Sequence, residues 1–513
     1  MYIAGAEFTS LMDKTCIEKY KMPELILMEN AAEVAFHRIL KIEKDLNERF
    51  RNITIVCASG NNGGDGFAIS RKLYNIGRNV NILSIGNLSN TRDSAKTNYK
   101  IASEIGIELI RIEKEEKASE KDEIKNILYK SDLILDCIFG AGLNRNIEGN
   151  YKDLIELINK SKEEFEYKIL AIDIPSGING STGQVMGISI EADFTITFEF
   201  FKRGFLRYGV EKYTGKVYVE KIGVPYKFYN EVEGLASFID EDFVLDNLII
   251  KKDYAHKGNF GKVLIFAGSN GLYGAAYLST QACVKTGSGL TTLVCNEDVQ
   301  KVLAVKLNEA MTCLYSNSEK VYDLIENVDA IAFGPGMGNN EKTSKLLEKI
   351  LSKVDLPIVI DADGINVFKS KYIVNNNPCI ITPHLGEFSR LSGSSVSEIE
   401  KDRIGYAQEY AKENEVILVL KGKNTIVTDG IRTMVNTTGN YAMANGGMGD
   451  TLTGIITSLC GQGYDAFIAA SIGVYLHGRC GDSIFKNKEI VNATDIIKTI
   501  PKELKILYNR INI

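Results

Sequence analysis

The sequence lacks long hydrophobic runs and closely spaced cysteine pairs. No stretch of its 513 residues approaches the roughly 18 consecutive apolar residues that a transmembrane helix needs. Residues 1–19 lack a basic segment followed by a long apolar one, so we expect no secretory signal. The nine cysteines are scattered without a C-x-x-C pair, and several lie inside apolar runs. This pattern is typical of reduced core residues and favours a cytoplasmic protein.

An excess of positive charge is also absent. The chain has 60 Lys and Arg residues against 66 Asp and Glu residues, which gives a formal net charge of −6. It therefore has no global positive field to hold a nucleic-acid backbone or an anionic membrane surface. We expect small-molecule substrates, with no nucleic acid and no membrane among the partners.

Short apolar runs alternate with amphipathic stretches along the chain. The apolar runs include ITIVCAS, VNILSIG and LILDCIFG in the first half, and VLIFAGS, AIAFGPG and PIVIDADG in the second. Alternation of strand, turn and helix predicts a mostly parallel sheet with helices on both faces. The sequence therefore predicts the α/β class for both halves.

The alternation weakens after Pro225, and a second series begins near residue 240. A chain of 513 residues is too long for one ordinary core, at roughly one domain per 100 to 200 residues. We therefore expect a first domain over residues 1–225, a linker over residues 226–240 and a second domain over residues 241–513.

A glycine-rich loop follows the first of these apolar runs. Residues 59–66 read SGNNGGDG and precede a helical pattern that begins at Phe67. Backbone N–H groups at a helix start form an anion site, and glycines allow the main chain to approach a phosphate. A tight turn without a ligand is the alternative, but it requires fewer glycines. The spacing is not G-x-G-x-x-G, so it gives little support to an ordinary dinucleotide oxidoreductase.

Polar residues also follow two later strands of the first half. Asp136 lies in LDCIFG, and Asp173 and Ser176 lie in AIDIPSG. Because ligands collect at the carboxyl ends of parallel strands, these oxygens could bind a hard cation together. Asp173 could also act as a general acid or base. Each aspartate alone is more often a helix cap or a solvated loop residue.

These segments resemble the N-terminal domain of the YjeF family, the Rossmann-like three-layer epimerase of hydrated NAD(P)H. The resemblance rests on Leu27–Ala31, the NNGGDG loop, Asp136–Leu143 and Asp173–Gly177. It implies that Asn62, Asp136 and Ser176 hold K⁺ and that Asp173 transfers the proton. The residues that it implies as contacts of the hydrated nucleotide are Asn61, Asn62, Gly63, Gly64, Asp65, Gly140, Ala141, Gly142, Leu143, Asn144, Arg145, Asn146 and Asp173.

The second half has its own glycine-rich turn. Residues 444–450 read ANGGMGD and precede the apolar helical run TLTGIITSLCGQG. The amides of this turn could stabilise charge on a transferring phosphoryl group, with Asp450 at the start of the helix. Because aspartate is also a favoured N-cap, capping is the alternative role of Asp450. Capping does not require the glycines that precede it, so we favour catalysis.

Three further segments of the second half follow predicted strands. Lys421–Thr425 supplies cations and small polar groups that could hold phosphates, although a solvated hairpin turn explains the same residues. Gly334–Gly338 allows the backbone to approach a ligand closely. His384 is one of four histidines in the chain, and a lone histidine is usually a surface or core residue.

Together these segments resemble the ribokinase-like α/β fold, and within it the ADP- or ATP-dependent NAD(P)HX dehydratase. The resemblance also covers Lys257–Leu264 and Tyr273–Ala276, and it departs at Tyr441-Ala442, where such proteins more often have Pro-Gly. It implies that the hydrated nucleotide contacts Ala275, Gly338, His384 and Asp450. The residues that it implies as contacts of ADP or AMP are Lys421, Gly422, Lys423, Asn424, Thr425 and Gly449.

The two resemblances imply a bifunctional repair enzyme for hydrated NADH and NADPH. The first domain would interconvert the R and S hydrates with K⁺. The second would dehydrate the S hydrate with Mg²⁺ and ADP, which we favour over ATP, to give AMP and phosphate. Asp450 would deprotonate the ring hydroxyl as it attacks the terminal phosphoryl group. We expect a homo-oligomer, the common outcome for such enzymes. The alternative is a small-molecule alcohol kinase of the ribokinase-like group with a non-catalytic N-terminal binding module.

Overall fold

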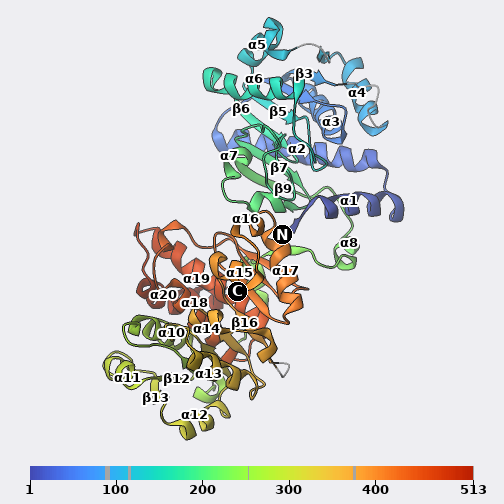
Figure 1. Cartoon of the computed structure of the whole chain (residues 1–513). Helices are drawn as coiled ribbons and strands as arrows, with labels where there is room; N and C mark the ends of the chain where they lie inside the picture. The colour runs from blue at the N-terminus through green and yellow to red at the C-terminus, as the bar shows by residue number, and fades with distance from the viewer. Residues whose placement is uncertain (87–92, 114–116, 252–253, 374–376, 512–513) are drawn as a thin grey trace. The chain divides into compact units, whose positions relative to one another are not determined.

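The computed structural model of the chain describes residues 1–86, 93–113, 117–251, 254–373 and 377–511 (Figure 1). The chain divides into two compact units, Met1–Leu235 and Ala236–Ile513. The stretch over residues 226–240, expected as a linker, holds α8 (Tyr226–Glu231) and β10 (Ala236–Phe238). Phe228 of α8 is buried in a core of the first unit, whereas β10 pairs with a strand of the second unit. Both elements of this stretch therefore belong to folded units.

The main sheet of the first unit consists of parallel strands throughout. Its order is β4-β3-β2-β5-β6-β7-β9, so the chain runs from β2 to one edge and then fills the other side. The strand order therefore reverses between β2 and β5, and ligands of such sheets bind in the crevice at that reversal. The strands are β2 (Asn52–Cys57), β3 (Asn79–Ile85), β4 (Glu108–Ile112), β5 (Leu133–Cys137), β6 (Lys168–Ile172), β7 (Phe194–Phe198) and β9 (Lys216–Glu220), and β1 (Tyr2–Ala4) pairs with β8 (Phe201–Lys202).

Helices cover both faces of this sheet (Figure 1). Along β2, Ile55 and Cys57 pack into the core under α2 and α3, whereas Val56 packs into the core under α5 and α6. This alternation confirms the three-layer α/β domain that the sequence predicts. The helices are α1 (Ala6–Lys14), α2 (Glu24–Leu46), α3 (Asn61–Asn75), α4 (Asp93–Glu104), α5 (Asp122–Lys130), α6 (Gly149–Phe165) and α7 (Glu211–Thr214), besides α8.

The glycine-rich loop of the first unit forms the first turn of α3. The helix begins at Asn61, earlier than the pattern from Phe67 predicts. Gly63 explains the early start, because a Cβ at this position would lie 1.8 Å from the Ala58 carbonyl oxygen. Only glycine lets the helix begin this close to the end of β2, and the helix start therefore lies at the point of strand reversal.

The sheet of the second unit is parallel from β13 to β17, and β18 is antiparallel to both of its neighbours. Within the unit the order is β13-β12-β11-β14-β15-β16-β17-β18-β19-β10, and it reverses between β11 and β14. The glycine-rich and polar motifs of this half thus follow the carboxyl ends of neighbouring strands. The strands are β11 (Lys262–Phe266), β12 (Leu290–Cys295), β13 (Met311–Leu314), β14 (Ala330–Phe333), β15 (Ile358–Ile360), β16 (Cys379–Ile381), β17 (Ile417–Leu420), β18 (Thr425–Thr428) and β19 (Thr433–Asn436).

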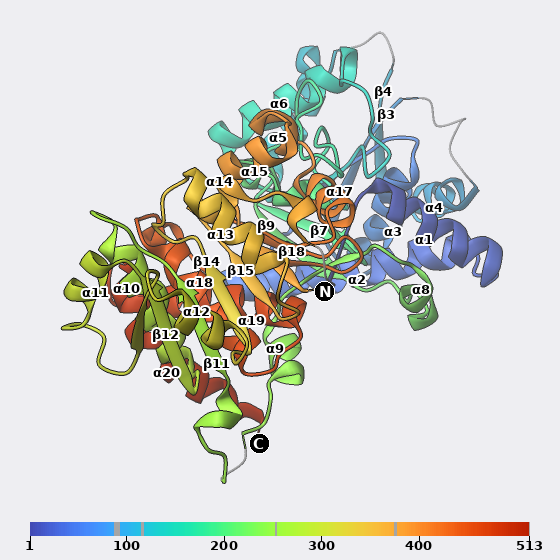
Figure 2. The same cartoon turned by 60° about the horizontal axis from the view of Figure 1, so that its bottom comes forward.

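One core of the second unit lies between the sheet and a group of apolar helices. Residues of α10, α18, α19 and α20 pack there against strands that Figure 2 shows side by side, including β11 and β12. The α18 run of apolar residues is buried almost throughout, which fixes the position of its first turn against the sheet. The helices are α9 (Glu241–Asn247), α10 (Tyr273–Thr286), α11 (Glu297–Leu303), α12 (Ser318–Ile325), α13 (Glu341–Leu351), α14 (Asp363–Val367), α15 (Leu385–Ser392), α16 (Val396–Ile399), α17 (Arg403–Glu413), α18 (Met448–Gly461), α19 (Ala466–Phe485) and α20 (Ala493–Ile511).

The cysteines are core residues in both units. All nine lie within the described part of the chain, where they are buried and free of disulfides. They therefore act as small apolar side chains, as the sequence predicts. None of the described helices is long and apolar enough to cross a membrane.

Candidate active sites

A cavity of about 870 Å³ lies at the carboxyl ends of β2, β5 and β6 in the first unit. This is the point of strand reversal, where an α/β sheet binds its ligand. Gly63 and Gly64 do not line the cavity, because they pack beneath the loop against Ala58 and Met28, and Asn146 also lies outside its lining. The implied nucleotide contacts that do line it are Asn61, Asn62, Asp65, Gly140, Ala141, Gly142, Leu143, Asn144, Arg145 and Asp173.

Asn62, Asp136 and Ser176 lie together beside this cavity. The Asp136 carboxylate accepts hydrogen bonds from the Ser176 N–H at 2.7 Å and from the Ser176 hydroxyl at 2.6 Å. The Asn62 amide nitrogen donates to the Phe139 carbonyl at 3.0 Å, while the Asn62 Oδ1 is buried without a hydrogen-bond partner. The arrangement gathers carboxylate, hydroxyl, amide and carbonyl oxygens in one place.

These oxygens fit a hard cation such as K⁺. Burial raises the pKa of Asp136 to about 6, and hydrogen bonds from Ser176 and Ile138 oppose that rise only in part. No cationic side chain contributes to this shift. A bound cation would supply the missing positive charge and would use the unpartnered Asn62 Oδ1.

Asp173 is paired with a buried lysine that the sequence analysis does not single out. The Lys202 ammonium lies 2.9 Å from the Asp173 Oδ1, and Lys202 is only 1% exposed. The Ala141 N–H lies 3.3 Å from the other carboxylate oxygen of Asp173. Lys202 stands in the aromatic-rich segment FEFFKRGF. A lysine in such a segment is the signal that could have identified it, because a buried lysine needs a partner.

In the second unit Asp450 lies in the first turn of α18, but it is not the N-cap. The N-cap is Gly447, whose φ of 89° is in the left-handed region. A Cβ at Gly447 would also lie 2.4 Å from Leu278. The turn therefore requires glycine at this position, and the Asp450 carboxyl is not used to cap the helix.

A buried ion pair lies next to Asp450. The Lys421 ammonium is 2.8 Å from the Asp361 Oδ1, and Asp361 also accepts hydrogen bonds from Thr382 and Thr453, each at 2.8 Å. Asp361, at the end of β15 in VIDADG, has no role in the sequence analysis. Burial and the Asp361 carboxylate raise the pKa of Asp450 to about 6, whereas Lys421 lowers it. This places the pKa of Asp450 close to neutral pH.

Lys421 reaches the glycine-rich turn. A Cβ at Gly449 would lie 3.2 Å from the Lys421 ammonium and 3.4 Å from the Asp361 Oδ2. The rest of the KGKNT segment forms the hairpin between the antiparallel strands β17 and β18, and the Thr425 hydroxyl donates to the Gly422 carbonyl. The segment thus forms a hairpin turn whose first residue, Lys421, lies beside the glycine turn, and its contact with a nucleotide stays a prediction.

His384 presents a hydrogen-bond donor. Its Nδ1 accepts the Gly386 N–H at 3.0 Å as the cap of α15, so the neutral ring carries its proton on Nε2. The side chain is 58% exposed, and its Nε2 lies 3.6 Å from the Glu387 Oε1. The main chain also joins His384 to the site, because the Lys421 N–H donates to the Pro383 carbonyl at 2.9 Å.

Ala275 lies at the start of α10, and Gly338 lies on the loop after β14. The Gly338 N–H donates to the Asp363 carboxylate at 2.8 Å, in the segment that also carries Asp361. Ala275 lies in the first turn of α10, where a Cβ at Gly336 would be 3.1 Å from the Ala275 Cβ. The two predicted substrate contacts are thus close in space.

The departure at Tyr441-Ala442 is local. Tyr441–Met443 forms a short 3₁₀ helix with Asn440 as its cap, and the Tyr441 hydroxyl donates to Glu489. The glycine turn that leads into α18 follows this segment.

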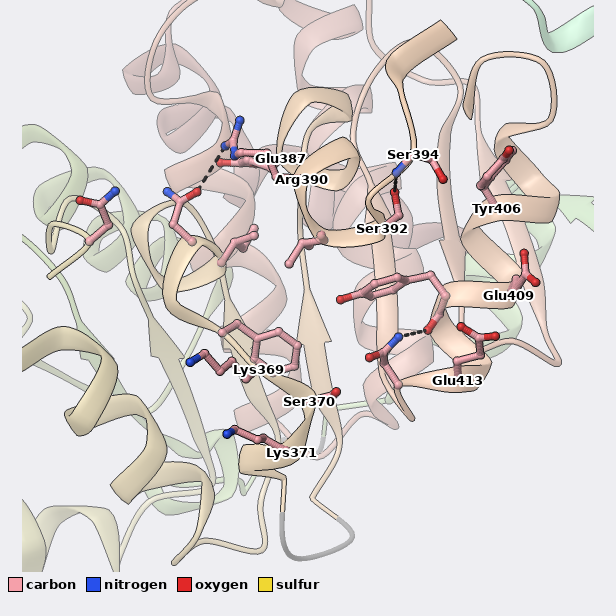
Figure 3. Close-up of a pocket in the computed structure, with 17 residues that line it drawn as sticks. Lys369, Ser370, Lys371, Glu387, Arg390, Ser392, Ser394, Tyr406, Glu409 and Glu413 are labelled. Carbon is pink, nitrogen blue, oxygen red and sulfur yellow. Dashed lines mark hydrogen bonds between the residues drawn. The ribbon is translucent and has the colours of Figure 1, made fainter. Parts of the chain in front are cut away.

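A separate cavity of about 940 Å³ in the second unit is lined from α14, α15 and α17 (Figure 3). None of the implied substrate or nucleotide contacts, all within the described residues, lines it. Its Glu387 carboxylate accepts the His384 N–H at 2.8 Å and so belongs to the cap of α15. Its charged residues are Lys369, Lys371, Arg390, Glu387, Glu409 and Glu413. The mixture of three cations and three carboxylates indicates no single class of ligand.

The fold and the two sites define an α/β enzyme with two active sites of the nucleotide-binding type. The family model of the YjeF-related protein N-terminus matches residues 24–204, and that of NAD(P)H-hydrate dehydratase matches residues 263–502. A bifunctional NAD(P)H-hydrate repair enzyme from Moorella thermoacetica is 33% identical, with 99% of this chain and 97% of the relative covered. Another, from Dictyoglomus turgidum, is 32% identical with both chains covered in full. The chain belongs to the family of bifunctional NAD(P)H-hydrate repair enzymes.

Solved structures match the second unit. The ADP/ATP-dependent NAD(P)H-hydrate dehydratase from Bacillus subtilis, co-crystallised with ATP and Mg²⁺, is 32% identical with a TM-score of 0.50. The match covers 53% of this chain and 99% of that one. A ribokinase-like superfamily protein from Enterococcus faecalis is 28% identical with a TM-score of 0.50, covering 53% of this chain and 96% of that one. The ribokinase-like fold predicted for the second half is confirmed.

The Lys421–Asp361 pair leads to a stability prediction. In Lys421→Met the Asp361 carboxylate stays buried without its cation, which we expect to lower the free energy of unfolding of the second unit by about 3 to 5 kcal/mol. Lys345→Met is the matched control, because its ammonium pairs with Glu341 on the surface and is 73% exposed. Urea unfolding, monitored by hydrogen exchange in peptides of the second unit, measures the loss of unfolding free energy in each variant. Equal losses of unfolding free energy in the two variants would contradict the view that the buried Asp361 carboxylate depends on Lys421.

Proposed function

We propose that the chain repairs hydrated NADH and NADPH in two steps. The first unit interconverts the R and S hydrates, and the second dehydrates the S hydrate to NAD(P)H while ADP is converted to AMP and phosphate. The position of Asp450 carries this proposal. Its carboxyl group does not cap the helix, has a pKa of about 6, and lies beside the Lys421 ammonium and the glycine turn. The full-length relatives with this activity in their names support it.

In the second unit Asp450 acts as the general base. Its carboxylate takes the proton of the ring hydroxyl while that oxygen attacks the terminal phosphorus of the nucleotide. The new O–P bond forms as the bond to the leaving AMP breaks. Lys421 and the amides of the turn stabilise the negative charge that develops on the phosphoryl oxygens.

Phosphorylation then permits the elimination. Hydroxide is a poor leaving group, whereas phosphate departs with the electron pair of the C–O bond. A proton leaves the neighbouring ring carbon, and the ring double bond of NAD(P)H is restored. His384, with its proton on Nε2, is placed to hold the substrate as a donor.

The second unit fits a Mg²⁺ that enters with the nucleotide. The described residues contain no group of three or more His, Cys, Asp or Glu side chains that could hold a metal ion. Mg²⁺ is commonly bound by one or two carboxylates together with substrate phosphates. When bound, it supplies further positive charge at the transferring phosphoryl group.

In the first unit K⁺ is held by Asn62, Asp136 and Ser176. The bound ion would complete the buried oxygen cluster and fix the loop after β2 against the loops after β5 and β6. Asp173 transfers a proton of the substrate, and the ammonium of Lys202 holds its carboxylate in place. The residues around the cavity contact the hydrated nucleotide.

We infer three further properties of the whole chain. ADP is the phosphoryl donor, in line with the ADP/ATP-dependent dehydratase of Bacillus subtilis. The enzyme works in the cytoplasm, where its nine buried thiols stay reduced. It assembles as a homo-oligomer, as most enzymes of this size and type do.

Assays with separated hydrates test the proposal. With S-hydrated NADPH and ADP, we expect recovery of the reduced-nicotinamide absorbance with AMP and phosphate as products, and a slower recovery with ATP. With the R hydrate, we expect the same product after epimerisation, above a blank that measures spontaneous epimerisation. A stable phosphorylated alcohol in place of NADPH would identify a small-molecule kinase and refute the dehydratase.

The pKa of Asp450 predicts the pH dependence of dehydration. The base form is present above the pKa, so we expect kcat on the S hydrate to rise as pH increases through about 6 and then to level off. Asp450→Asn should lower kcat by at least about 100-fold above pH about 6 and should lack the rise with pH, because an amide accepts no proton. Epimerisation of the R hydrate by the first unit is the internal control. If Asp450→Asn keeps the wild-type kcat and its rise with pH, Asp450 is not the base.

A further inference from the structure

Asp65 and Asp173, two of the carboxyl residues that line the cavity of the first unit, differ in their partners within the ranges that the structure describes: one has a cation and the other has none. Asp65 lies one turn into α3, and Asp173 follows β6. The Asp173 carboxylate is paired with the Lys202 ammonium at 2.9 Å. Among the described residues, no hydrogen bond or ion pair is found for the Asp65 side chain, and only carboxylates act on its charge.

The charged groups that act electrostatically on Asp65 are all negative. They are Asp13 of α1, Glu24 of α2 and Asp173. Lys202 is committed to Asp173 and to the Phe198 carbonyl at 3.2 Å. Burial, together with these three carboxylates, raises the pKa of Asp65 well above its ordinary range. The other charged residues of the cavity lining are Lys14, Glu18 and Arg145.

Carboxyl groups that share a cavity divide their roles by environment. The one next to a cation stays ionised, and the one without a cation keeps the proton. In this cavity Asp173 has the cation and Asp65 does not. We propose that Asp65 is the general acid of the epimerisation and that the Asp173 carboxylate is its general base. This inference rests on the proposed epimerase function of the first unit.

The chemistry of the hydrate requires both groups. Its hydroxyl stands on a carbon bonded to the ring nitrogen. Asp65 donates its proton to this hydroxyl, the C–O bond breaks with its electron pair, and water departs while the nitrogen lone pair forms a C=N⁺ bond. Water then adds to the other face of the planar carbon and gives its proton to Asp173. Proton return from Asp173 to Asp65 through solvent closes the cycle, so atoms and charge balance.

Asp65→Asn tests the assignment, because an amide of the same size cannot donate the acid proton. We expect its epimerisation kcat to fall by about 100-fold or more, and Asp65→Glu to recover part of the rate. The wild-type rate should fall as pH rises through the pKa of Asp65, and Asp65→Asn should lack this limb. Asp122→Asn is the matched control, because Asp122 lies on α5 outside the cavity and its side chain is 94% exposed.

The outcomes separate this inference from the function on which it rests. If the wild-type protein does not accelerate exchange of the R and S hydrates above the blank, the proposed epimerase itself fails. If the wild type does so and Asp65→Asn keeps its rate and pH profile, only the assignment of Asp65 is overturned. Dehydration of pure S hydrate reports only that the second unit of the variant is intact, so unfolding of the first unit is measured separately.

A second readout does not depend on activity. Because the folded state raises the pKa of Asp65, folding favours its protonated form, and the wild-type first unit loses stability as pH rises from the ordinary aspartate range toward that pKa. Asp65→Asn removes this loss. The unfolding midpoint of the variant relative to the wild type should therefore increase with pH over this window. If the difference in unfolding midpoint between Asp65→Asn and the wild type does not change with pH, Asp65 is not the protonated acid, even if the variant is inactive.

Discussion

In each unit a lysine is paired with an aspartate at the end of a parallel strand, and one partner of each pair is buried: Lys202 with Asp173, and Lys421 with Asp361. Each pair cancels one negative charge inside its site. The other aspartate, Asp65 or Asp450, lies near the start of a helix without a cation of its own and has a raised pKa. The ion pair therefore decides which carboxyl stays ionised, and the chemistry proposed for both sites depends on it.

The fold explains why the same arrangement occurs twice. In both sheets the strand order reverses, so the loops after neighbouring strands meet at one crevice. A glycine-rich segment begins α3 in one unit and α18 in the other, and in both a residue with a Cβ would collide with its surroundings, at Gly63 and at Gly447. Glycine brings the helix start to the crevice, where backbone amides and a carboxyl lie close together, an arrangement suited to an anionic ligand.

Much of the fold and many residues of the two sites could be predicted from the sequence, because they depend on patterns among neighbouring residues. Apolar runs predicted the parallel strands, and residues at or just after the ends of strands, such as Asp136 and Asp173, lie at the first site. The partners of these residues could not be predicted. Lys202 and Asp361 are brought to their sites by tertiary packing, and no spacing in the sequence links Lys202 to Asp173 or Lys421 to Asp361. The predicted start of α3 was wrong. The helix begins earlier because Gly63, which has no Cβ, can pack against the Ala58 carbonyl, and the sequence does not show that contact.

The central claim is that the ring hydroxyl becomes bonded to phosphorus and leaves as part of phosphate, with Asp450 as the base. An S hydrate labelled with ¹⁸O in its hydroxyl group tests this claim most directly when a variant without epimerase activity turns it over with unlabelled ADP, because epimerisation itself exchanges the hydroxyl oxygen with water. The account predicts one ¹⁸O atom in each inorganic phosphate released, detected by mass spectrometry. Label recovered in water, with unlabelled phosphate, would contradict it.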